Sequence, residues 1–179
     1  MFMQEMRGPL VCHVREPYPA ITVEGPNREY AEILMGDYAG KDSELTAILQ
    51  YIYGNLVSSN VEVAQLLMCI ARVEMHHFHM LGETIKLLGV DPRYQHMGKY
   101  WNASFVKYER DTCKILHANR EDEMAAIREY RRQAARIADT NVKELLLRIA
   151  RDEEVHARLL GEAIEKYCSL NIQNTIATT

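Results

Sequence analysis

Apolar residues recur every three or four positions over four long stretches of this chain, and polar or proline-containing segments separate the stretches. This spacing is typical of amphipathic α-helices. No stretch shows the sustained alternation that predicts a strand, and no hairpin turn pair is evident. The spacing therefore predicts an all-α fold with helices over 28–56, 59–88, 117–138 and 141–167.

The ends of the predicted helices carry recognisable signals. Asn27 is expected to cap the first helix, and Ser59 with Glu62 forms a capping box for the second. Asn141 and Glu144 form a similar cap pair for the fourth. Within the first helix, two glycines, Gly36 and Gly40, weaken the pattern and predict a bend.

Three segments fall outside the predicted helices. Residues 1–27 hold four of the five prolines and predict an extended arm over the domain. Residues 89–116 mix aromatic and basic side chains and predict a crossover connection with a short helix near 99–110. The polar tail 169–179 is expected to fray.

The link between the last two helices is short, so they are expected to be antiparallel neighbours. Two αα-hairpins joined by a long crossover form a four-helix bundle with one long connection. The length of 179 residues predicts a single domain. Its expected parts are the arm 1–27, the helical bundle 28–168 and the tail 169–179.

An internal repeat with an offset of 79 residues organises the chain. A Glu-x-x-His occurs in both halves, and a single glutamate precedes each copy by 30 residues. A glutamate and a histidine three positions apart lie on one face of a helix. The residues that match in register are Glu44 with Glu123, Glu74 with Glu153, and His77 with His156.

These six residues interrupt otherwise apolar helix faces. Ionised carboxylates in a bundle core are costly unless they are paired or bound to metal. Four glutamates and two histidines that converge in such a core predict two divalent metal ions held by Glu44, Glu74, His77, Glu123, Glu153 and His156. Nitrogen and oxygen ligands of this kind accept Mn, Fe or Zn.

Composition narrows the remaining possibilities. The net charge of −4 argues against a nucleic-acid surface, and no apolar run has membrane-spanning length. The four cysteines are scattered and form no Cys-x-x-Cys, which excludes a rubredoxin or zinc-ribbon module. Cys69 is expected to be a small buried apolar residue. A soluble, cytoplasmic protein is predicted, with no membrane partner.

The motifs resemble those of the ferritin-like dimetal-carboxylate superfamily. The run Glu44–Tyr51 looks like the first-helix signature of bacterioferritins and manganese catalases. Tyr38-Ala39-Gly40 resembles manganese catalases of the spore-coat type. Glu123 with Tyr130 is similar to the third-helix signature of the superfamily, and residues 152–156 to the fourth.

The resemblance implies a role for each predicted ligand. Glu44 and Glu123 would be terminal ligands, Glu74 and Glu153 would bridge the metals, and each histidine would bind one metal. Tyr51 and Tyr130 lie seven residues after the terminal glutamates, so they could hydrogen-bond to ligand carboxylates, although a role as core aromatics is equally open. Glu44, Glu121 or one of these tyrosines could move protons, which makes Glu44, Tyr51 and Tyr130 the catalytic candidates.

The resemblance also implies a function. The leading hypothesis is a dinuclear Mn or Fe oxidoreductase that removes hydrogen peroxide, like manganese catalases or like rubrerythrins without a rubredoxin domain. Rubrerythrins carry an extra glutamate on the third helix, for which Glu121 is the nearest equivalent. The alternative is a ferroxidase or iron-binding protein that uses O₂, and a third reading is a structural bundle without metal. Members of the superfamily commonly self-associate, so a homo-oligomer is expected.

Overall fold

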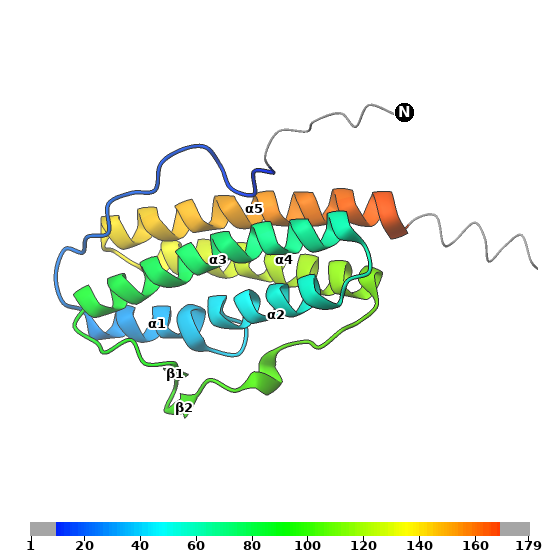
Figure 1. The fold of residues 1–179 in the computed structure, drawn as a ribbon. Helices are drawn as coiled ribbons and strands as arrows, with labels where there is room; N and C mark the ends of the chain where they lie inside the picture. The colour runs from blue at the N-terminus through cyan, green and yellow to red at the C-terminus, as the bar shows by residue number, and fades with distance from the viewer. Residues whose placement is uncertain (1–9, 169–179) are drawn as a thin grey trace, which may run out of the picture.

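The computed structural model describes residues 10–168, which form a four-helix bundle covered by an arm (Figure 1). Its helices are α1 (Arg28–Ala39), α2 (Glu44–Val57), α3 (Val61–Leu87), α4 (Thr112–Arg136) and α5 (Thr140–Cys168). The helices α1 and α2 follow one another end to end and together make one rod of the bundle (Figure 1). The predicted fold class, two hairpins joined by a long crossover, is therefore confirmed.

The first rod is broken rather than bent. Gly40 ends α1 with its amide donating to the carbonyl oxygen of Gly36 at 2.9 Å, and a Cβ on Gly40 would collide with that oxygen. The Ser43 hydroxyl then accepts from the amide of Thr46 and starts α2. Glu44 is consequently the first residue of a new helix, where the partial positive charge of the helix N-terminus favours a carboxylate.

The predicted caps are partly right. Asn27 does cap α1. Ser59 does not cap α3, because the Asn60 side chain accepts from the amides of Glu62 and Val63 instead.

The last two helices also begin earlier than predicted. The Asp139 carboxylate, rather than the predicted pair Asn141 and Glu144, accepts from the first amides of α5. Asp111 caps α4. The helix α4 thus begins at Thr112, five residues before the predicted start.

The crossover between α3 and α4 contains a small hairpin, and the short helix predicted near 99–110 is a single 3₁₀ turn. The strands β1 (Gln95–His96) and β2 (Lys99–Tyr100) pair antiparallel. Met97 and Gly98 between them both have positive φ, as a two-residue hairpin turn requires. A 3₁₀ turn at Ala103–Phe105 follows. Strands of two residues give no alternation signal, which is why the sequence did not indicate them.

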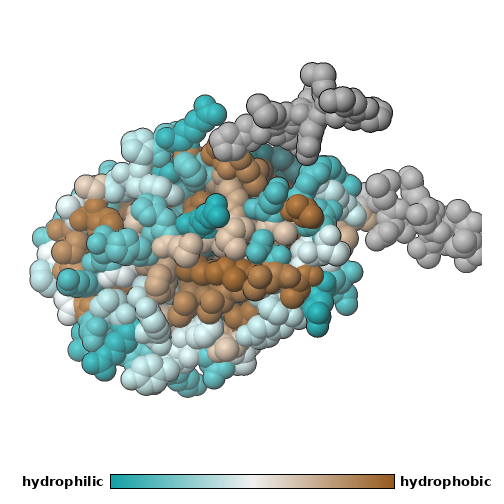
Figure 2. Space-filling model, in the orientation of Figure 1, coloured by the Kyte–Doolittle hydropathy of each residue, from teal (hydrophilic) through white to brown (hydrophobic). Residues whose placement is uncertain are grey.

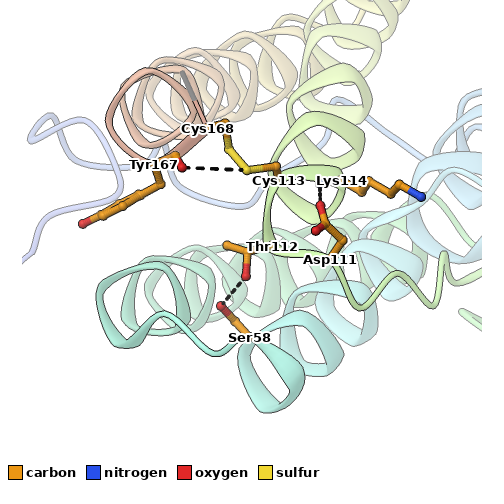
Figure 3. The surroundings of a disulfide bond; sticks show 7 residues. All are labelled: Ser58, Asp111, Thr112, Cys113, Lys114, Tyr167 and Cys168. Carbon is orange, nitrogen blue, oxygen red and sulfur yellow. Dashed lines mark hydrogen bonds between the residues drawn. A yellow bond between two sulfur atoms is a disulfide. The ribbon is translucent and has the colours of Figure 1, made fainter. Parts of the chain in front are cut away.

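Residues 10–27 form the predicted extended arm, which crosses the bundle on the side of α3 and α5 (Figure 1). A disulfide joins Cys12 to Cys69 on α3, with 6.1 Å between their Cα atoms. A second joins Cys113, at the N-terminus of α4, to Cys168, at the C-terminus of α5, with 5.7 Å between Cα atoms (Figure 3). The expectation that Cys69 is only a small buried apolar residue is wrong, because the arm brings a second cysteine to it.

Three further predictions concern the chain ends, the membrane and the domain division. The fraying tail 169–179 lies outside the described residues, as do residues 1–9 of the arm. Among the helices of the described part, none combines the length and the apolarity that crossing a bilayer requires. The single-domain division over 1–179 stays a prediction.

The apolar core lies in two clusters along the helices. One contains Leu81 and Leu146, and the other contains Leu67 and Leu160. On both α3 and α5 the Glu-x-x-His lies between residues of the two clusters. A thin polar layer therefore lies between the two apolar clusters. We use this name for the six residues Glu44, Glu74, His77, Glu123, Glu153 and His156.

The outer surface also carries apolar residues. Figure 2 shows a band of them across the face where α2 and α3 lie. Large exposed apolar side chains of these helices are Leu49, Leu56, Val61, Met75 and Leu87. Surfaces of this kind are common at protein–protein contacts, and the expected homo-oligomer stays a prediction.

Candidate metal centre

The polar layer holds all six predicted ligands, and every one of them is buried. Their donor atoms form two groups of four, within each of which all atoms lie within 4.8 Å of one another. The first group is Glu44, Glu74, His77 and Glu153, and the second is Glu74, Glu123, Glu153 and His156. Glu74 and Glu153 belong to both groups.

The two shared carboxylates reach between the two imidazoles. The Nδ1 atom of His77 lies 2.9 Å from Oε2 of Glu74 and 3.0 Å from Oε1 of Glu153. The Nδ1 atom of His156 lies 3.0 Å from Oε1 of Glu74 and 2.7 Å from Oε2 of Glu153. Each shared glutamate thus points one oxygen toward each histidine, which is the arrangement of a carboxylate that bridges two ions.

The other two glutamates flank this pair. Oε1 of Glu44 lies 3.9 Å from His77 Nδ1, and Oε1 of Glu123 lies 3.6 Å from His156 Nδ1. The hydroxyl of Tyr130 donates to Glu44, and that of Tyr51 donates to Glu123. Each tyrosine therefore holds the glutamate of the other half of the repeat.

Burial and mutual repulsion set the ionisation of these groups. Burial, together with the charges of Glu74 and Glu153, raises the pKa of Glu44 well above its usual value. Burial and the charge of Glu153 raise the pKa of Glu123 to about 7. Burial, with Glu123 and Glu44 respectively, also raises the pKa values of Tyr51 and Tyr130.

The pKa values of Glu74 and His156 shift in the direction that favours the charged form. Burial opposes ionisation of Glu74, but the charge of His156 together with hydrogen bonds from His156 and His77 outweighs it and lowers the pKa. Burial lowers the pKa of His156, and the carboxylates of Glu74 and Glu153 reverse this and raise it. The carboxylates around His156 thus favour the protonated form of its imidazole.

The donor set fits two divalent cations. Four ionised carboxylates with two neutral imidazoles carry the charge that two such ions would neutralise. Oε1 of Glu74 and Oε1 of Glu153 are buried, and although each lies 3.0 Å from an imidazole Nδ1, neither contact has the geometry of a hydrogen bond. Buried polar atoms of native proteins are nearly always paired, so unpaired carboxylate oxygens in this layer point to a cation site.

A cavity of about 500 Å³ leads to this layer from the side of α2 and α4. All four glutamates of the layer and both tyrosines line it, whereas His77 and His156 do not. Gly40 and Ser43, at the break between α1 and α2, also line it. The break therefore opens the side of the bundle from which a small molecule can reach the carboxylates.

Sequence reasoning missed some polar residues around the layer. Asp152 accepts a hydrogen bond from Nε2 of His77 at 3.1 Å, and its place directly before Glu153 carried no signal of that role. Asp37 and Gln133 hydrogen-bond to one another beside the cavity. Conversely, Glu121 is exposed and is absent from the cavity lining, so it is a wrong candidate for the proton-transfer group.

Comparison with known proteins identifies the family. The family model described as manganese containing catalase matches residues 13–103. This chain belongs to the manganese-containing catalase family. A probable manganese catalase from Clostridium acetobutylicum is 26% identical over 168 residues, which covers 82% of this chain and 75% of that protein.

Solved structures support the fold. A manganese catalase from Anabaena PCC7120 superposes with a TM-score of 0.79 at 24% identity, over 88% of this chain and 80% of that one. A bacterioferritin from Mycobacterium tuberculosis gives 0.66 at 24% identity, over 79% and 87%. A bacterioferritin from Rhodobacter capsulatus, described with a metal-free dinuclear site, gives 0.69 at 22%, over 83% and 91%.

Membership of the family confirms the predictions of a dinuclear metal cofactor and of a peroxide-removing oxidoreductase of the catalase type. The residue-by-residue roles within the layer stay predictions.

Proposed function

We propose that this protein converts two molecules of hydrogen peroxide into water and dioxygen at a dimanganese centre in the polar layer. The observation that carries the proposal is the pair of four-atom groups that share Glu74 and Glu153 and open onto one cavity. We assign Glu44 and Glu123 as terminal ligands, Glu74 and Glu153 as bridging ligands, and His77 and His156 as one ligand to each ion.

The chemistry divides between the metal and the chain. Two adjacent manganese ions, when bound, supply the two-electron exchange with peroxide, so the reaction needs no external reductant. The chain holds the ions close together and keeps the histidine side closed, because the cavity reaches only the carboxylate side. Peroxide therefore approaches between Glu44 and Glu123.

Proton movement falls to groups that line the cavity. The hydroxyl of Tyr51 donates a hydrogen bond to Glu123, and that of Tyr130 donates one to Glu44. Asp37 lines the same cavity, and burial raises its pKa to about 7, so it can take up and release protons near neutrality. These side chains give a path by which protons leave one peroxide and reach the oxygens of another.

Elemental analysis and an oxygen electrode test the proposal together. Protein loaded with Mn is expected to hold about two ions per chain and to release O₂ from peroxide without a reductant. Glu74→Ala is expected to reduce the rate at least about 100-fold. This is more than the loss of a residue that only hydrogen-bonds to a metal ligand costs. Glu121→Ala serves as the matched control, because Glu121 lies on α4 near Glu123 but faces solvent.

A ferroxidase is the second candidate, and the structural likeness to bacterioferritins is the observation that favours it. It predicts that the iron-loaded protein consumes O₂ with Fe²⁺ and retains many irons per chain, while the manganese form fails to release O₂. That pair of results would overturn the catalase proposal.

A further inference from the structure

The two halves of the repeat differ where they support the two histidines. Asp152 lies on α5 directly before Glu153, and the 79-residue offset places Val73 at the matching position on α3. Nε2 of His77 donates to Oδ2 of Asp152 at 3.1 Å. Nε2 of His156 is buried and has no hydrogen-bond partner. In an otherwise symmetric layer, the Nε2 atom of one imidazole thus has a carboxylate partner and that of the other has none.

Asp152 is itself held firmly. The amide of Val14 donates to its Oδ1 at 2.8 Å, and the hydroxyl of Tyr18 donates to its Oδ2. Nη1 of Arg148 pairs with Oδ1 at 2.8 Å. With His77 as the fourth partner, each oxygen of the carboxylate has two contacts, three of them hydrogen bonds and one an ion pair. Asp152 is fully buried, so these contacts are not exchanged with water.

The arm supplies part of this support. Arg148 donates to the carbonyl oxygens of Val14 and Glu16 and lies 4.0 Å from the centre of the Tyr18 ring. The position that matches Arg148 in the repeat is Cys69, which the disulfide joins to Cys12 of the same arm. The arm is therefore anchored at both matching positions, covalently on α3 and by polar contacts on α5. Only the α5 anchor reaches a histidine.

A carboxylate behind a metal-binding histidine fixes the ring and its tautomer and makes the free nitrogen a better ligand. Losing such a partner typically costs about 10- to 100-fold in metal affinity. Here Asp152 takes the proton on Nε2 of His77, so Nδ1 stays free on the side of Glu74 and Glu153. No described residue accepts a proton from Nε2 of His156 in this way.

We infer that the two metal positions are unequal, and that Asp152, held by the arm, is a positioning residue that makes the His77 position the tighter one. The inference rests on the dimanganese site of the proposed function. The ion beside His77 binds first and leaves last, and the ion beside His156 exchanges more readily with solution.

Two histidine variants compare the positions directly. Free Mn²⁺ has an electron paramagnetic resonance signal, so a titration that follows this signal measures metal binding without any activity. His156→Ala leaves the His77 position, and His77→Ala leaves the His156 position. The first variant is expected to bind its ion about 10- to 100-fold more tightly than the second. Equal affinities in the two variants would overturn the inference.

Asp152→Asn, combined with each histidine variant, tests the cause. The substituted asparagine keeps the size of the side chain but loses the charge that fixes the His77 proton. The difference between the two histidine variants is expected to disappear, with the weaker affinity found in both. If the difference persists, Asp152 is not its source. Circular dichroism melting of each variant checks that the fold is retained.

A gain-of-function variant avoids any damage to the arm. Val73→Asp places a carboxylate on α3 at the position that matches Asp152 and leaves Asp152 itself untouched. Metal binding to the His156 position is expected to tighten by about 10- to 100-fold, while the His77 position stays as it was. Unchanged binding at both positions would count against the inference. If the wild-type protein binds no Mn²⁺ at all, the proposed function fails instead.

Discussion

At the scale of single residues, Asp37 and Gln133 form a buried pair whose hydrogen bonds are complete only when Asp37 is protonated. Nε2 of Gln133 donates to Oδ1 of Asp37 at 2.9 Å, while Oδ2 of Asp37 and Oε1 of Gln133 are left without a partner. A protonated carboxyl group is a donor as well as an acceptor, so the neutral acid can satisfy both atoms. Burial raises the pKa of Asp37 to about 7 and favours that form.

This pair predicts a pH dependence of stability. The unfolded chain ionises Asp37 near its ordinary value of 3.8, whereas the folded protein keeps the proton up to about pH 7. The folded state binds more protons between these values, so the free energy of unfolding falls as pH rises through this window. The loss from pH 5 to pH 8 is expected to be roughly 3 kcal/mol.

Asp37→Asn isolates this contribution, because asparagine stays neutral at both pH values. The variant is expected to match the wild type near pH 5 and to exceed its unfolding free energy near pH 8. Urea unfolding at the two pH values measures this. The same fall with pH in both proteins would show that Asp37 ionises normally in the folded state.

At the scale of the helix, Asp139 performs two tasks. Its Oδ1 accepts from the amides of Asn141 and Val142 at the start of α5, and its Oδ2 accepts from the amide of Glu24 in the arm. A single buried carboxylate thus caps a helix and fixes the end of the arm.

Asp139→Ala should therefore cost more than the loss of an ordinary cap. Removing a cap costs about 1 kcal/mol, and losing the hydrogen bond to the Glu24 amide adds about 1 kcal/mol. Asn60→Ala on α3 is the matched control, because the Asn60 side chain caps that helix and makes no hydrogen bond to the described residues of the arm. Urea unfolding of both variants decides, and equal losses would show that the arm contact contributes nothing.

Element by element, the sequence predicted helices better than what lies between them. Glu74 and Glu153 were found because the repeat preserves residue identity and spacing. Asp152 was missed for the opposite reason, since its counterpart in the repeat is Val73 and a search for matching residues passes over it. The start of α4 was placed late because its first turn, Thr112–Leu116, follows an irregular aromatic segment and has no clear period of its own.

Contacts between distant residues were also beyond the sequence. The pairing of Asp37 with Gln133 joins α1 to α4, and the pairing of Cys12 with Cys69 joins the arm to α3. Neither involves a spacing that a helix or a turn would impose. Such pairs follow from how the helices and the arm pack, which local patterns do not encode.

At the scale of the whole molecule, two disulfides close loops of nearly equal length. The sequence separations are 57 and 55 residues. In the chain-entropy account, loops of similar length stabilise similarly, by about 2–4 kcal/mol each. Disulfides of this kind persist mainly in oxidising compartments, and the cytoplasmic location stays a prediction.

Two double variants, each with one disulfide replaced by serines, are expected to separate stability from metal binding. Replacing Cys12 and Cys69 by serine, or Cys113 and Cys168, should lower the unfolding free energy by similar amounts. Only the first pair anchors the arm that holds Asp152, so only its loss should also weaken retention of manganese. Melting temperatures and metal content after dialysis measure the two effects, and parallel losses of metal in both variants would contradict this.

The 79-residue repeat divides the ligands of the polar layer equally between two hairpins. One hairpin carries a single glutamate and one Glu-x-x-His, which is half of what two ions require. Two identical hairpins, associated as separate chains, would already complete both positions with perfect symmetry. In a single chain, joined by a crossover that carries none of the six ligands, the two halves can differ. A break in one rod and one aspartate behind one histidine are differences that a pair of identical chains could not carry on one side alone.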